Sequence, residues 1–320
     1  MSTHPAHLLD IDDRTPDEIH GLLDIATSLK RGHQPTRLTD RTVALLFEQP
    51  STRTRASFEA GINRLGGSVM FLGPDDTQLA RGEPIRDTAR ALSQYVDAAA
   101  LRVADHADLV EFANYAEMPV VNALSDRAHP CQALADVLTI REEVGPFDSS
   151  TAVWIGDGNN VAASFTLAAA AVGLETYVVT PPGHGLPADV IERAERLGRP
   201  PTVTHEVHPA VERADVVYTD TWVSMSEEGA QTDRAAKVAE FDGYQVNESL
   251  LTDSDAAVMH CLPAHRGEEV TDEVLEGERS LIWQQAANRL FVQNAVLLNL
   301  LGDLSGHLLE QETLPLKEAP

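Results

Sequence analysis

The sequence predicts an α/β protein with two doubly wound domains, each a parallel sheet flanked by helices. Three observations support this fold class. Apolar runs of strand length alternate with helical patterns, as in parallel sheets that are covered on both faces. A composition break near the middle divides these runs into two sets of similar size. Polar clusters follow the strands, which places a ligand site in the cleft between the domains.

The first predicted element is a helix that begins after Thr15. Thr15-Pro16-Asp17-Glu18 supplies an N-cap, a proline at the first helical position and a glutamate placed for a capping box. An apolar stripe continues the helix to Lys30-Arg31-Gly32, which is typical of a helix end. The predicted strands are 42–47, 68–72, 98–103 and 119–124 in the first half, and 151–155, 176–180, 202–206, 216–219, 257–262 and 280–283 in the second.

The composition break is GPFDSS at 145–150, and it sets the expected domain boundary. We expect a first domain of residues 1–146 and a second of residues 147–286. The last helix, about Ala286 to Leu301, is rich in apolar residues. It is expected to cross back, so that residues 287–320 pack on the first domain.

The charge is strongly acidic, with 50 Asp and Glu against 24 Lys and Arg and a net charge of −26. Such a surface repels nucleic acid, so no nucleic-acid partner is expected. The acids could meet a cationic partner, or they could keep the protein soluble at high salt, as in halophiles. Their scattered placement favours the halophilic interpretation.

Cysteine content and hydropathy indicate the compartment. The chain has only two cysteines, Cys131 and Cys261, which is too few for a disulfide framework and suits a reducing cytoplasm. No apolar stretch reaches the length of a membrane span, and the N-terminus has no secretory pattern. A cytoplasmic protein without a membrane partner is therefore expected.

The stretch PSTRTR at 50–55 lies between a predicted strand and a predicted helix. Free backbone N–H groups and the positive end of the helix dipole meet there. Hydroxyls from Ser51, Thr52 and Thr54 and a guanidinium add to them, which suits a phosphate or a similar anion. The two arginines at a spacing of two, Arg53 and Arg55, favour this interpretation. The stretch is no Walker loop, because it has no glycine run and no lysine. The simpler alternative is a capped helix with exposed arginines.

A second cluster, SDRAHPCQ at 125–132, also opens a helix. Pro130 suits the first helical position, so His129 falls at the N-cap and Gln132 at the third position. Arg102 ends a neighbouring strand and is expected to join them. Such a group could polarise a carbonyl and hold an amide-like NH2, although a histidine at a cap is often only a cap.

Three further clusters follow strands of the second half. WIGDGNN at 154–160 resembles part of a dinucleotide fingerprint, but it lacks the third glycine, and the next strand ends in prolines rather than in an acid. Asn160 could instead hold a carboxylate. Asp220 to Met225 and His260 to Arg266 complete the set. Cys261 with two histidines fits no common zinc spacing, so no metal is expected, and Cys261 could simply be a packed strand residue.

Taken in this order, the motifs resemble those of the ornithine carbamoyltransferases. The quoted matches are STRTR at 51–55, HPCQ at 129–132, Asp220 with Ser224-Met225, and HCLP at 260–263, and the resemblance covers nearly the whole chain. The first two motifs are shared by carbamoyltransferases in general, whereas the last two point to ornithine. One departure is Ser226, where the family usually has glycine.

The resemblance implies transfer of a carbamoyl group from carbamoyl phosphate to the δ-amine of L-ornithine, giving L-citrulline and phosphate, or the reverse reaction. It implies no cofactor, and it implies a homotrimer or a higher assembly of trimers. The catalytic residues would be Arg102, His129, Asp220 and Cys261. Ornithine would be bound by Asn160, Asp220, Ser224 and Met225. The carbamoyl-phosphate residues would be Ser51, Thr52, Arg53, Thr54, Gln78, Arg102, His129, Gln132, Cys261, Leu262 and Arg289, with Gln78 reaching into a neighbouring subunit.

Three rival hypotheses remain open. The nearest is the same chemistry on another amine, such as aspartate, putrescine or an acylated ornithine. Another is a dinucleotide-dependent oxidoreductase, which the missing third glycine disfavours. The last is a non-catalytic anion-binding protein, which would explain the 51–55 cluster but not the other polar clusters at strand ends.

Overall fold

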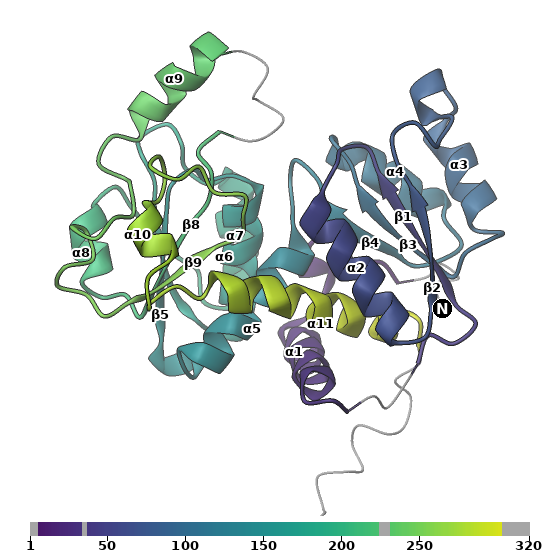
Figure 1. Cartoon of the computed structure of the whole chain (residues 1–320), viewed down its shortest axis with the longest axis horizontal. Coiled ribbons are helices and arrows are strands. Elements are labelled where there is room, and N and C mark those ends of the chain that lie inside the picture. The colour runs from purple at the N-terminus through teal and green to yellow at the C-terminus, as the bar shows by residue number, and fades with distance from the viewer. Residues whose placement is uncertain (1–5, 34–36, 224–230, 303–320) are drawn as a thin grey trace, which may run out of the picture.

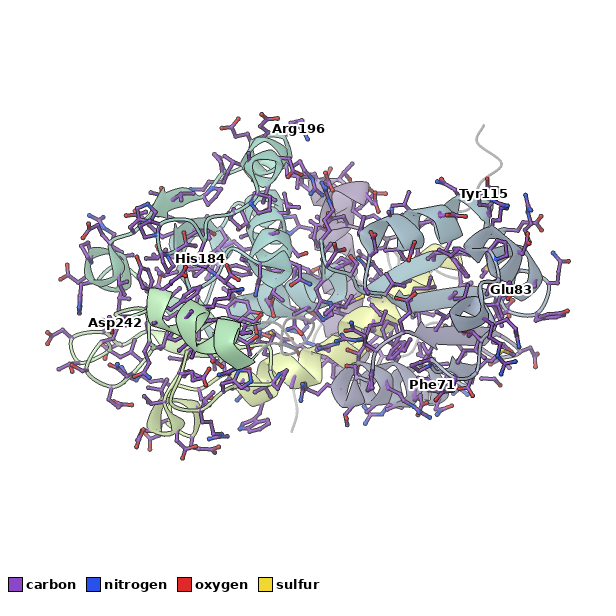
Figure 2. The ribbon with its side chains drawn as sticks, turned by 90° about the horizontal axis from the view of Figure 1, so that it is seen from above. Phe71, Glu83, Tyr115, His184, Arg196 and Asp242 are labelled. Atoms are coloured by element: carbon purple, nitrogen blue, oxygen red, sulfur yellow. The ribbon has the colours of Figure 1, made fainter. Side chains whose placement is uncertain are left out.

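Two parallel sheets, each covered by helices, form the two lobes of the computed structural model (Figure 1). The structure describes residues 6–33, 37–223 and 231–302. Figure 2 gives the view from above, in which the lobes lie side by side, with Phe71, Glu83 and Tyr115 labelled on the first and His184, Arg196 and Asp242 on the second. The α/β fold class predicted from the sequence is confirmed.

The first sheet has the strand order β2-β1-β3-β4, and all its pairs are parallel. Its strands are β1 (Thr42–Phe47), β2 (Ser68–Leu72), β3 (Ala98–Arg102) and β4 (Val120–Leu124). Its helices are α1 (Pro16–Lys30), α2 (Thr52–Arg64), α3 (Ile85–Leu92), α4 (His106–Tyr115) and α5 (Pro130–Glu143), with short 3-10 turns η1 (Ile11–Asp13), η2 (Leu79–Arg81) and η3 (Phe147–Ser149).

The second sheet has the order β7-β6-β5-β8-β9 and is also parallel throughout. Its strands are β5 (Thr151–Ile155), β6 (Glu175–Val179), β7 (Thr202–Thr204), β8 (Val216–Thr219) and β9 (Ala257–His260). Its helices are α6 (Asn160–Val172), α7 (Ala188–Leu197), α8 (Val207–Val211), α9 (Gln231–Glu240) and α10 (Asp272–Leu275), and α11 (Ile282–Leu300) follows them.

Nine of the ten predicted strands are present, with ends that shift by a few residues. The tenth, residues 280–283, is wrong. Ser280 forms only an isolated bridge with Val258, and α11 begins at Ile282. The apolar run Leu281-Ile282-Trp283 belongs to the start of a helix, and so short a run has no period that would distinguish helix from strand.

The start of α1 follows the predicted chemistry. The Thr15 hydroxyl accepts from the Glu18 N–H, and the Glu18 carboxylate accepts from the Thr15 N–H at 2.8 Å. This reciprocal capping box satisfies two of the backbone donors that a helix start leaves free. The helix then buries the predicted apolar stripe, with Leu23 and Ala26 fully buried.

Helix α11 leaves the second lobe and packs along α1, α2 and α5 of the first (Figure 1). Asn294 donates from Nδ2 to the Gly61 carbonyl of α2 at 3.1 Å. A Cβ at Gly61 would lie 2.4 Å from Asn294 Oδ1, so only glycine permits this close approach. The return of the last helix to the first lobe is therefore present from Ile282 to Leu300, while residues 303–320 lie outside the described residues.

A buried ion pair joins the lobes on the side of η1. Arg193 of α7 donates to Asp10 at 2.5 Å, and it donates from Nε to Asp12 at 2.8 Å. Burial raises the pKa of Asp10 despite the guanidinium, whereas the hydrogen bond from Arg193 lowers the pKa of Asp12. Both partners of the Asp10–Arg193 pair have side chains only 9% exposed, so water could replace little of what either partner loses when the other is removed.

No helix in the described ranges combines the length and apolar character that crossing a bilayer requires.

We predict that Arg193→Met lowers the free energy of unfolding by about 3 kcal/mol, because it leaves the buried Asp10 carboxyl without its partner. Adding Asp10→Asn should recover part of that loss. Arg199→Met is the matched control, since its pair with Glu175 is exposed and should contribute less than about 1 kcal/mol. Urea unfolding monitored by circular dichroism measures all three. Equal losses for Arg193 and Arg199 would contradict the prediction.

Candidate active site

A cavity of about 580 Å3 lies at the carboxyl ends of the strands, between the two lobes. Parallel α/β sheets bind ligands at this edge because the loops there open outward and helices begin there. Residues from both domains and from α11 contribute: Gln49 to Thr54, Arg102, Val103, Ala104, Leu124, Asp126, His129, Gln132, Asp157, Asn159, Asn160, Val161, Asp220, Thr221, Cys261, Leu262, Pro263 and Arg289. The predicted clusters are thus brought to one place.

The N-terminus of α2 forms one wall of this cavity. Ser51 is its N-cap, and the Ser51 hydroxyl accepts from the Thr54 N–H at 3.4 Å. The N–H groups of Thr52 and Arg53 lie in the first turn, where no intrahelical carbonyl is available. With the dipole of a 13-residue helix behind them, these groups favour an anion at this wall.

Three guanidinium groups converge on the same wall, from Arg53, Arg102 and Arg289. Burial, together with the charges of Arg289 and Arg53, lowers the pKa of Arg102 to about 10. The Nε atoms of Arg102 and Arg289 are buried without a hydrogen-bond partner in the protein. Like charges gathered in a partly desolvated place favour a negatively charged ligand, because it relieves their repulsion.

His129 occupies the N-cap position of α5, as predicted, but its side chain makes no cap hydrogen bond. Its backbone N–H instead donates to Ser164 Oγ of α6 at 2.8 Å. The residue is 4% exposed, and Nδ1 of its ring has no hydrogen-bond partner. Burial and the charges of Arg289 and Arg102 hold the pKa of His129 well below its ordinary value, so the ring is a neutral hydrogen-bonding group at pH 7.

Arg289 connects the two clusters of the first domain. It donates to Gln132 Oε1 at 2.9 Å and to Thr54 Oγ1 at 2.7 Å. Since the Thr54 oxygen accepts from Arg289, its own O–H proton is available to donate into the cavity. The oxygen of the Gln132 amide keeps one lone pair for a ligand N–H, because a carbonyl oxygen has two.

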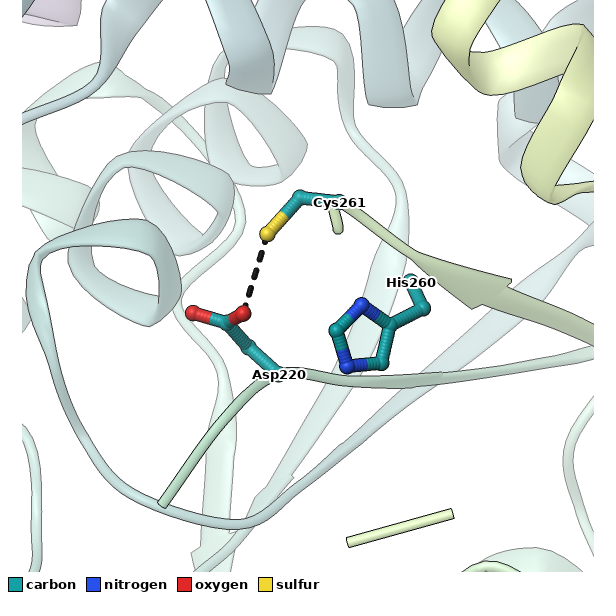
Figure 3. A group of neighbouring side chains, drawn as sticks. All are labelled: Asp220, His260 and Cys261. Atoms are coloured by element: carbon teal, nitrogen blue, oxygen red, sulfur yellow. Dashed lines mark hydrogen bonds between the residues drawn. The ribbon is translucent and has the colours of Figure 1, made fainter. Parts of the chain in front are cut away.

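The second-domain wall centres on Asp220, which directly follows β8. The Cys261 thiol donates to Asp220 Oδ1 at 3.0 Å, as Figure 3 shows, and Asn159 Nδ2 donates to Oδ2 at 3.0 Å. Burial and the neighbouring Asp220 carboxylate raise the pKa of Cys261 well above its ordinary value. Cys261 is therefore a neutral thiol that orients a carboxylate, and no thiolate nucleophile is present at pH 7.

Asn160 joins this wall to the first domain. It lines the cavity, and its Nδ2 donates to the Ser125 carbonyl at 2.6 Å. Neighbouring Asn159 has another task, because its Oδ1 caps α6 by accepting from the Val161 and Ala162 N–H groups. In the WIGDGNN turn, Asn159 therefore caps the helix, whereas the amide oxygen of Asn160 remains available to a ligand.

The loop after β9 is held by a buried histidine. His260 Nδ1 accepts from the Leu262 N–H at 2.9 Å, so the proton lies on Nε2, which contacts Glu269 Oε1 at 3.1 Å. Leu262 has a φ of 61°, and the Leu262–Pro263 peptide is cis. The contacts of His260 with Leu262 and Glu269 hold Cys261 and the Leu262 carbonyl at the cavity.

Asp220, His260 and Cys261 bring three possible metal-ligand atoms within 4.8 Å of one another. The hydrogen bonds already made do not suit a metal. Both ring nitrogens of His260 are engaged, and the Cys261 proton is committed to Asp220. A second group, His265, Glu268 and Glu269, has Glu268 bound by both terminal nitrogens of Arg234. A bound cation would face that guanidinium.

Two residues of the quoted motifs and predicted site do not line the cavity. Arg55 is exposed, pairs with Glu59 at 2.8 Å and stacks over Phe71, so Arg53 is the arginine of STRTR that lines the cavity. Gln78 is exposed and does not line the cavity, and its role in a neighbouring subunit stays a prediction. Ser224 and Met225, together with Ser226, lie outside the described residues.

Sequence reasoning missed a set of residues that support the site from behind. Asp136 is fully buried and accepts from Gln132, and Gln285 is fully buried and donates to Asp136. Each lies one helical turn from a predicted residue, Asp136 after Gln132 and Gln285 before Arg289. That spacing of four on a helix was the available signal.

The fold and the cavity define a class of protein: a two-domain α/β protein whose interdomain cavity combines a helix N-terminus, three arginines, a neutral histidine and a polar second-domain wall. Two family models match the chain. Residues 6–142 match "Aspartate/ornithine carbamoyltransferase, carbamoyl-P binding domain", and residues 148–300 match "Aspartate/ornithine carbamoyltransferase, Asp/Orn binding domain". The chain belongs to the aspartate/ornithine carbamoyltransferase family.

Named relatives are similar over nearly their whole length. The ornithine carbamoyltransferase of Haloquadratum walsbyi is 56% identical over 298 residues, which are 93% of this chain and 98% of that protein. That of Archaeoglobus fulgidus is 47% identical and covers 92% of this chain and 97% of its own length. The solved ornithine carbamoyltransferase of Pyrococcus furiosus matches with a TM-score of 0.87 at 44% identity, covering 94% of this chain and 99% of that one.

We predict that Cys261 reacts slowly with iodoacetamide at pH 8 in the folded protein, and that Asp220→Asn speeds the reaction about tenfold. The variant removes a negative charge and an acceptor that both raise the pKa of the thiol, and only the thiolate reacts. Cys131 is the internal control, since burial raises its pKa to about 12 in both proteins. Peptide mass spectrometry measures both rates. An unchanged Cys261 rate in the variant would contradict the prediction.

Proposed function

We propose that the protein transfers the carbamoyl group of carbamoyl phosphate to the δ-amine of L-ornithine, giving L-citrulline and phosphate, and that it catalyses the reverse reaction as well. The observation that supports it best is the single cavity in which an anion-binding helix start, a neutral histidine and the Asp220–Cys261 pair meet. Membership of the family and relatives named for this activity agree with it.

Carbamoyl phosphate binds on the first-domain wall in this proposal. Its phosphate is held by the Ser51, Thr52 and Thr54 hydroxyls, the N–H groups of the α2 start and Arg53. Arg102 and His129 point their donors at the carbonyl oxygen, and Gln132 accepts from the NH2. Arg289 orients Gln132 and Thr54 from behind, and the Leu262 carbonyl and Cys261 flank the reacting carbon.

Ornithine binds on the opposite wall, with its α-amino and α-carboxylate groups toward Asn160, Asp220, Ser224 and Met225. Asp220 suits an ammonium group because it is an acceptor oriented by Asn159 and Cys261. A basic side chain for a second carboxylate is absent among the described lining residues of this wall, which favours ornithine over aspartate as acceptor.

The reaction follows from the charges. The δ-ammonium group first loses one proton to solvent. The resulting amine attacks the carbonyl carbon, which forms a C–N bond, places negative charge on the oxygen and leaves the nitrogen with one further proton to release. Arg102, His129 and the Thr54 hydroxyl stabilise this oxyanion by donating to it. The C–O bond to phosphate then breaks, and phosphate leaves into the Arg53 cluster and accepts the amine proton. Holding both substrates in one cleft supplies much of the rate.

The domain assignment is part of the same proposal. Residues 1–146 form the carbamoyl-phosphate domain, with the C-terminal segment 287–320 packing back on it, and residues 147–286 form the ornithine domain. The subunits assemble as homotrimers, or as assemblies of trimers, in which Gln78 completes a neighbour's site. The two free cysteines, Cys131 and Cys261, suit the reducing cytoplasm as the location.

We predict that citrulline forms from carbamoyl phosphate and ornithine at molar salt, and that Arg53→Ala lowers kcat/KM at least about a hundredfold, because it removes a phosphate-binding charge. Arg55→Ala is the matched control. It comes from the same motif and helix but is exposed and outside the cavity, so its activity should stay within about twofold of the wild type.

Three other acceptors, aspartate, putrescine and N-acetylornithine, extend this assay. Turnover of one of them in place of ornithine would move the acceptor assignment and keep the chemistry. Failure of the folded protein to carbamoylate any amine would overturn the proposed transferase.

The protein is also proposed to be halophilic, as its net charge of −26 indicates. We predict that raising KCl from 0.1 to 2 M, at pH 7.5, raises Tm by about 5 °C or more, because salt screens repulsion among the surface carboxylates. Near pH 4.7, the pI of the sequence, the same change in salt should have little effect, because the net charge is then close to zero. A Tm at pH 7.5 that does not change with KCl concentration would contradict the halophilic proposal.

A further inference from the structure

Asp136 is a fully buried carboxyl that lies behind the cavity and does not line it. Three donors from three separate elements point at it. Gln132 Nε2 of α5 and Gln285 Nε2 of α11 both donate to Oδ1 at 2.7 Å, and the Tyr218 hydroxyl of β8 donates to Oδ2 at 3.0 Å. Burying a carboxyl that has three neutral donors and no contacting cation costs free energy of folding. A function of this carboxyl at the site would account for that cost.

Each of the three donors leads to a residue of the site. Gln132 lines the cavity itself, and its Oε1 accepts from Arg289. Gln285 accepts from the His260 N–H at 3.0 Å, next to Cys261 in the chain. Tyr218 lies two residues before Asp220 on β8. One carboxylate therefore touches the supports of both walls.

The orientation of the Gln132 amide depends on an acceptor at Asp136 Oδ1. An amide has a donor end and an acceptor end, and either can be turned toward the ligand. A carboxylate only accepts, so it fixes Nε2 of Gln132 at its own side and leaves Oε1 facing Arg289 and the cavity. With the amide turned over, Nε2 would face the guanidinium of Arg289 and the NH2 of the ligand, which are both donors.

We propose that Asp136 is a positioning residue that, as a carboxylate, orients the Gln132 amide to accept from the NH2 of the carbamoyl group and so makes the site selective for carbamoyl phosphate over other acyl phosphates. The inference rests on the proposed function, which supplies the carbamoyl ligand. Asp136 itself touches no reacting atom.

Titration supports this geometry. Burial raises the pKa of Asp136 to about 7, against the lowering effect of its three hydrogen bonds and of Arg289. The ionisable groups that face it are Tyr218 of β8, Cys261 after β9 and Arg289 of α11. Burial raises the pKa of Tyr218 and Cys261 well above their ordinary values, so both stay neutral. The carboxyl of Asp136 therefore changes charge near neutral pH.

The test compares two ligands that differ only where Gln132 acts. Acetyl phosphate carries CH3 in place of the NH2 of carbamoyl phosphate and keeps the carbonyl and the phosphate. Calorimetry at pH 8.5 and molar salt measures both affinities for the wild type and for Asp136→Leu. Leucine removes both carboxylate oxygens, so no acceptor fixes the amides of Gln132 and Gln285. Asparagine is unsuitable, because its Oδ1 could still accept from both glutamines while its Nδ2 donates to the Tyr218 hydroxyl.

We expect the wild type to prefer carbamoyl phosphate by about tenfold, the effect of one hydrogen bond, and Asp136→Leu to lose that preference. The affinity of the variant for acetyl phosphate should stay within about twofold of the wild type, because the phosphate cradle is separate from Asp136. A variant that keeps the preference, or that loses both ligands in parallel, overturns the inference. A wild type that binds no carbamoyl phosphate overturns the proposed function itself.

A second measurement needs no change at Asp136. In the wild type, the preference should fall as pH drops from 8.5 to 6, with a midpoint near 7, while phosphate protonation affects both ligands alike. Tyr218→Phe removes one hydrogen bond that lowers the pKa of Asp136, so the midpoint should move to higher pH and the preference at pH 8.5 should remain. A preference that is independent of pH in both proteins contradicts the inference.

Discussion

The candidate site depends on the hydrogen bonds that the buried guanidinium of Arg289 makes. This guanidinium binds Thr54 of α2 and Gln132 of α5 from a helix that is added last in the chain. Burial lowers its pKa, and it forms no ion pair within 4 Å in the described part of the chain. Its charge is balanced by the hydroxyl and amide dipoles around it. An anionic ligand completes that balance, so ligand binding and the packing of α11 support each other.

The positive cavity sits in a strongly negative protein, and this contrast links salt to function. With a net charge of −26, the surface repels a phosphate-bearing substrate at low ionic strength. At molar salt, the range of that repulsion shrinks to about 3 Å. Arg53, Arg102 and Arg289 act at contact distance, where screening is weak. Salt therefore removes the barrier to entry and leaves the binding charges effective.

Local signals in the sequence were enough for most of the fold. The Thr15–Glu18 capping box and the apolar strands depend on neighbouring residues, and the structure agrees with them. The placement of Arg55 outside the cavity has a geometric cause. Residues two apart on a helix lie about 200° apart around its axis, so Arg53 and Arg55 cannot both face one anion once the helix has begun.

Asp136 shows what sequence reasoning could not find. In a helix with an apolar stripe, an acid normally marks the solvated face, and α5 instead is buried on nearly every side by α11, α6 and α1. That burial comes from long-range packing, which no local pattern reports. Two of the hydrogen-bond partners of Asp136, Tyr218 and Gln285, lie 82 and 149 residues away along the chain.

The pKa values of Asp12 and Asp136 are shifted in opposite directions, so the two carboxyls act on stability in opposite directions. Arg193 lowers the pKa of Asp12, so that ion pair stabilises the fold above the ordinary Asp pKa and the contribution is lost in acid. Asp136 behaves in the reverse way. Its pKa rises from 3.8 to about 7, so the folded protein holds this proton more tightly than the unfolded chain does. Its contribution is complete below about pH 3.8 and is lost as pH rises through 7.

The carboxylate form that orients Gln132 is thus the one that the fold favours less. A leucine or methionine at position 136 would avoid this cost, as buried ionic groups can often be replaced by apolar ones without loss of stability. Such a residue would leave the amides of Gln132 and Gln285 without an acceptor and free to turn over. Stability therefore favours an apolar residue at position 136, whereas selectivity for the carbamoyl group favours an acid that accepts from Gln132.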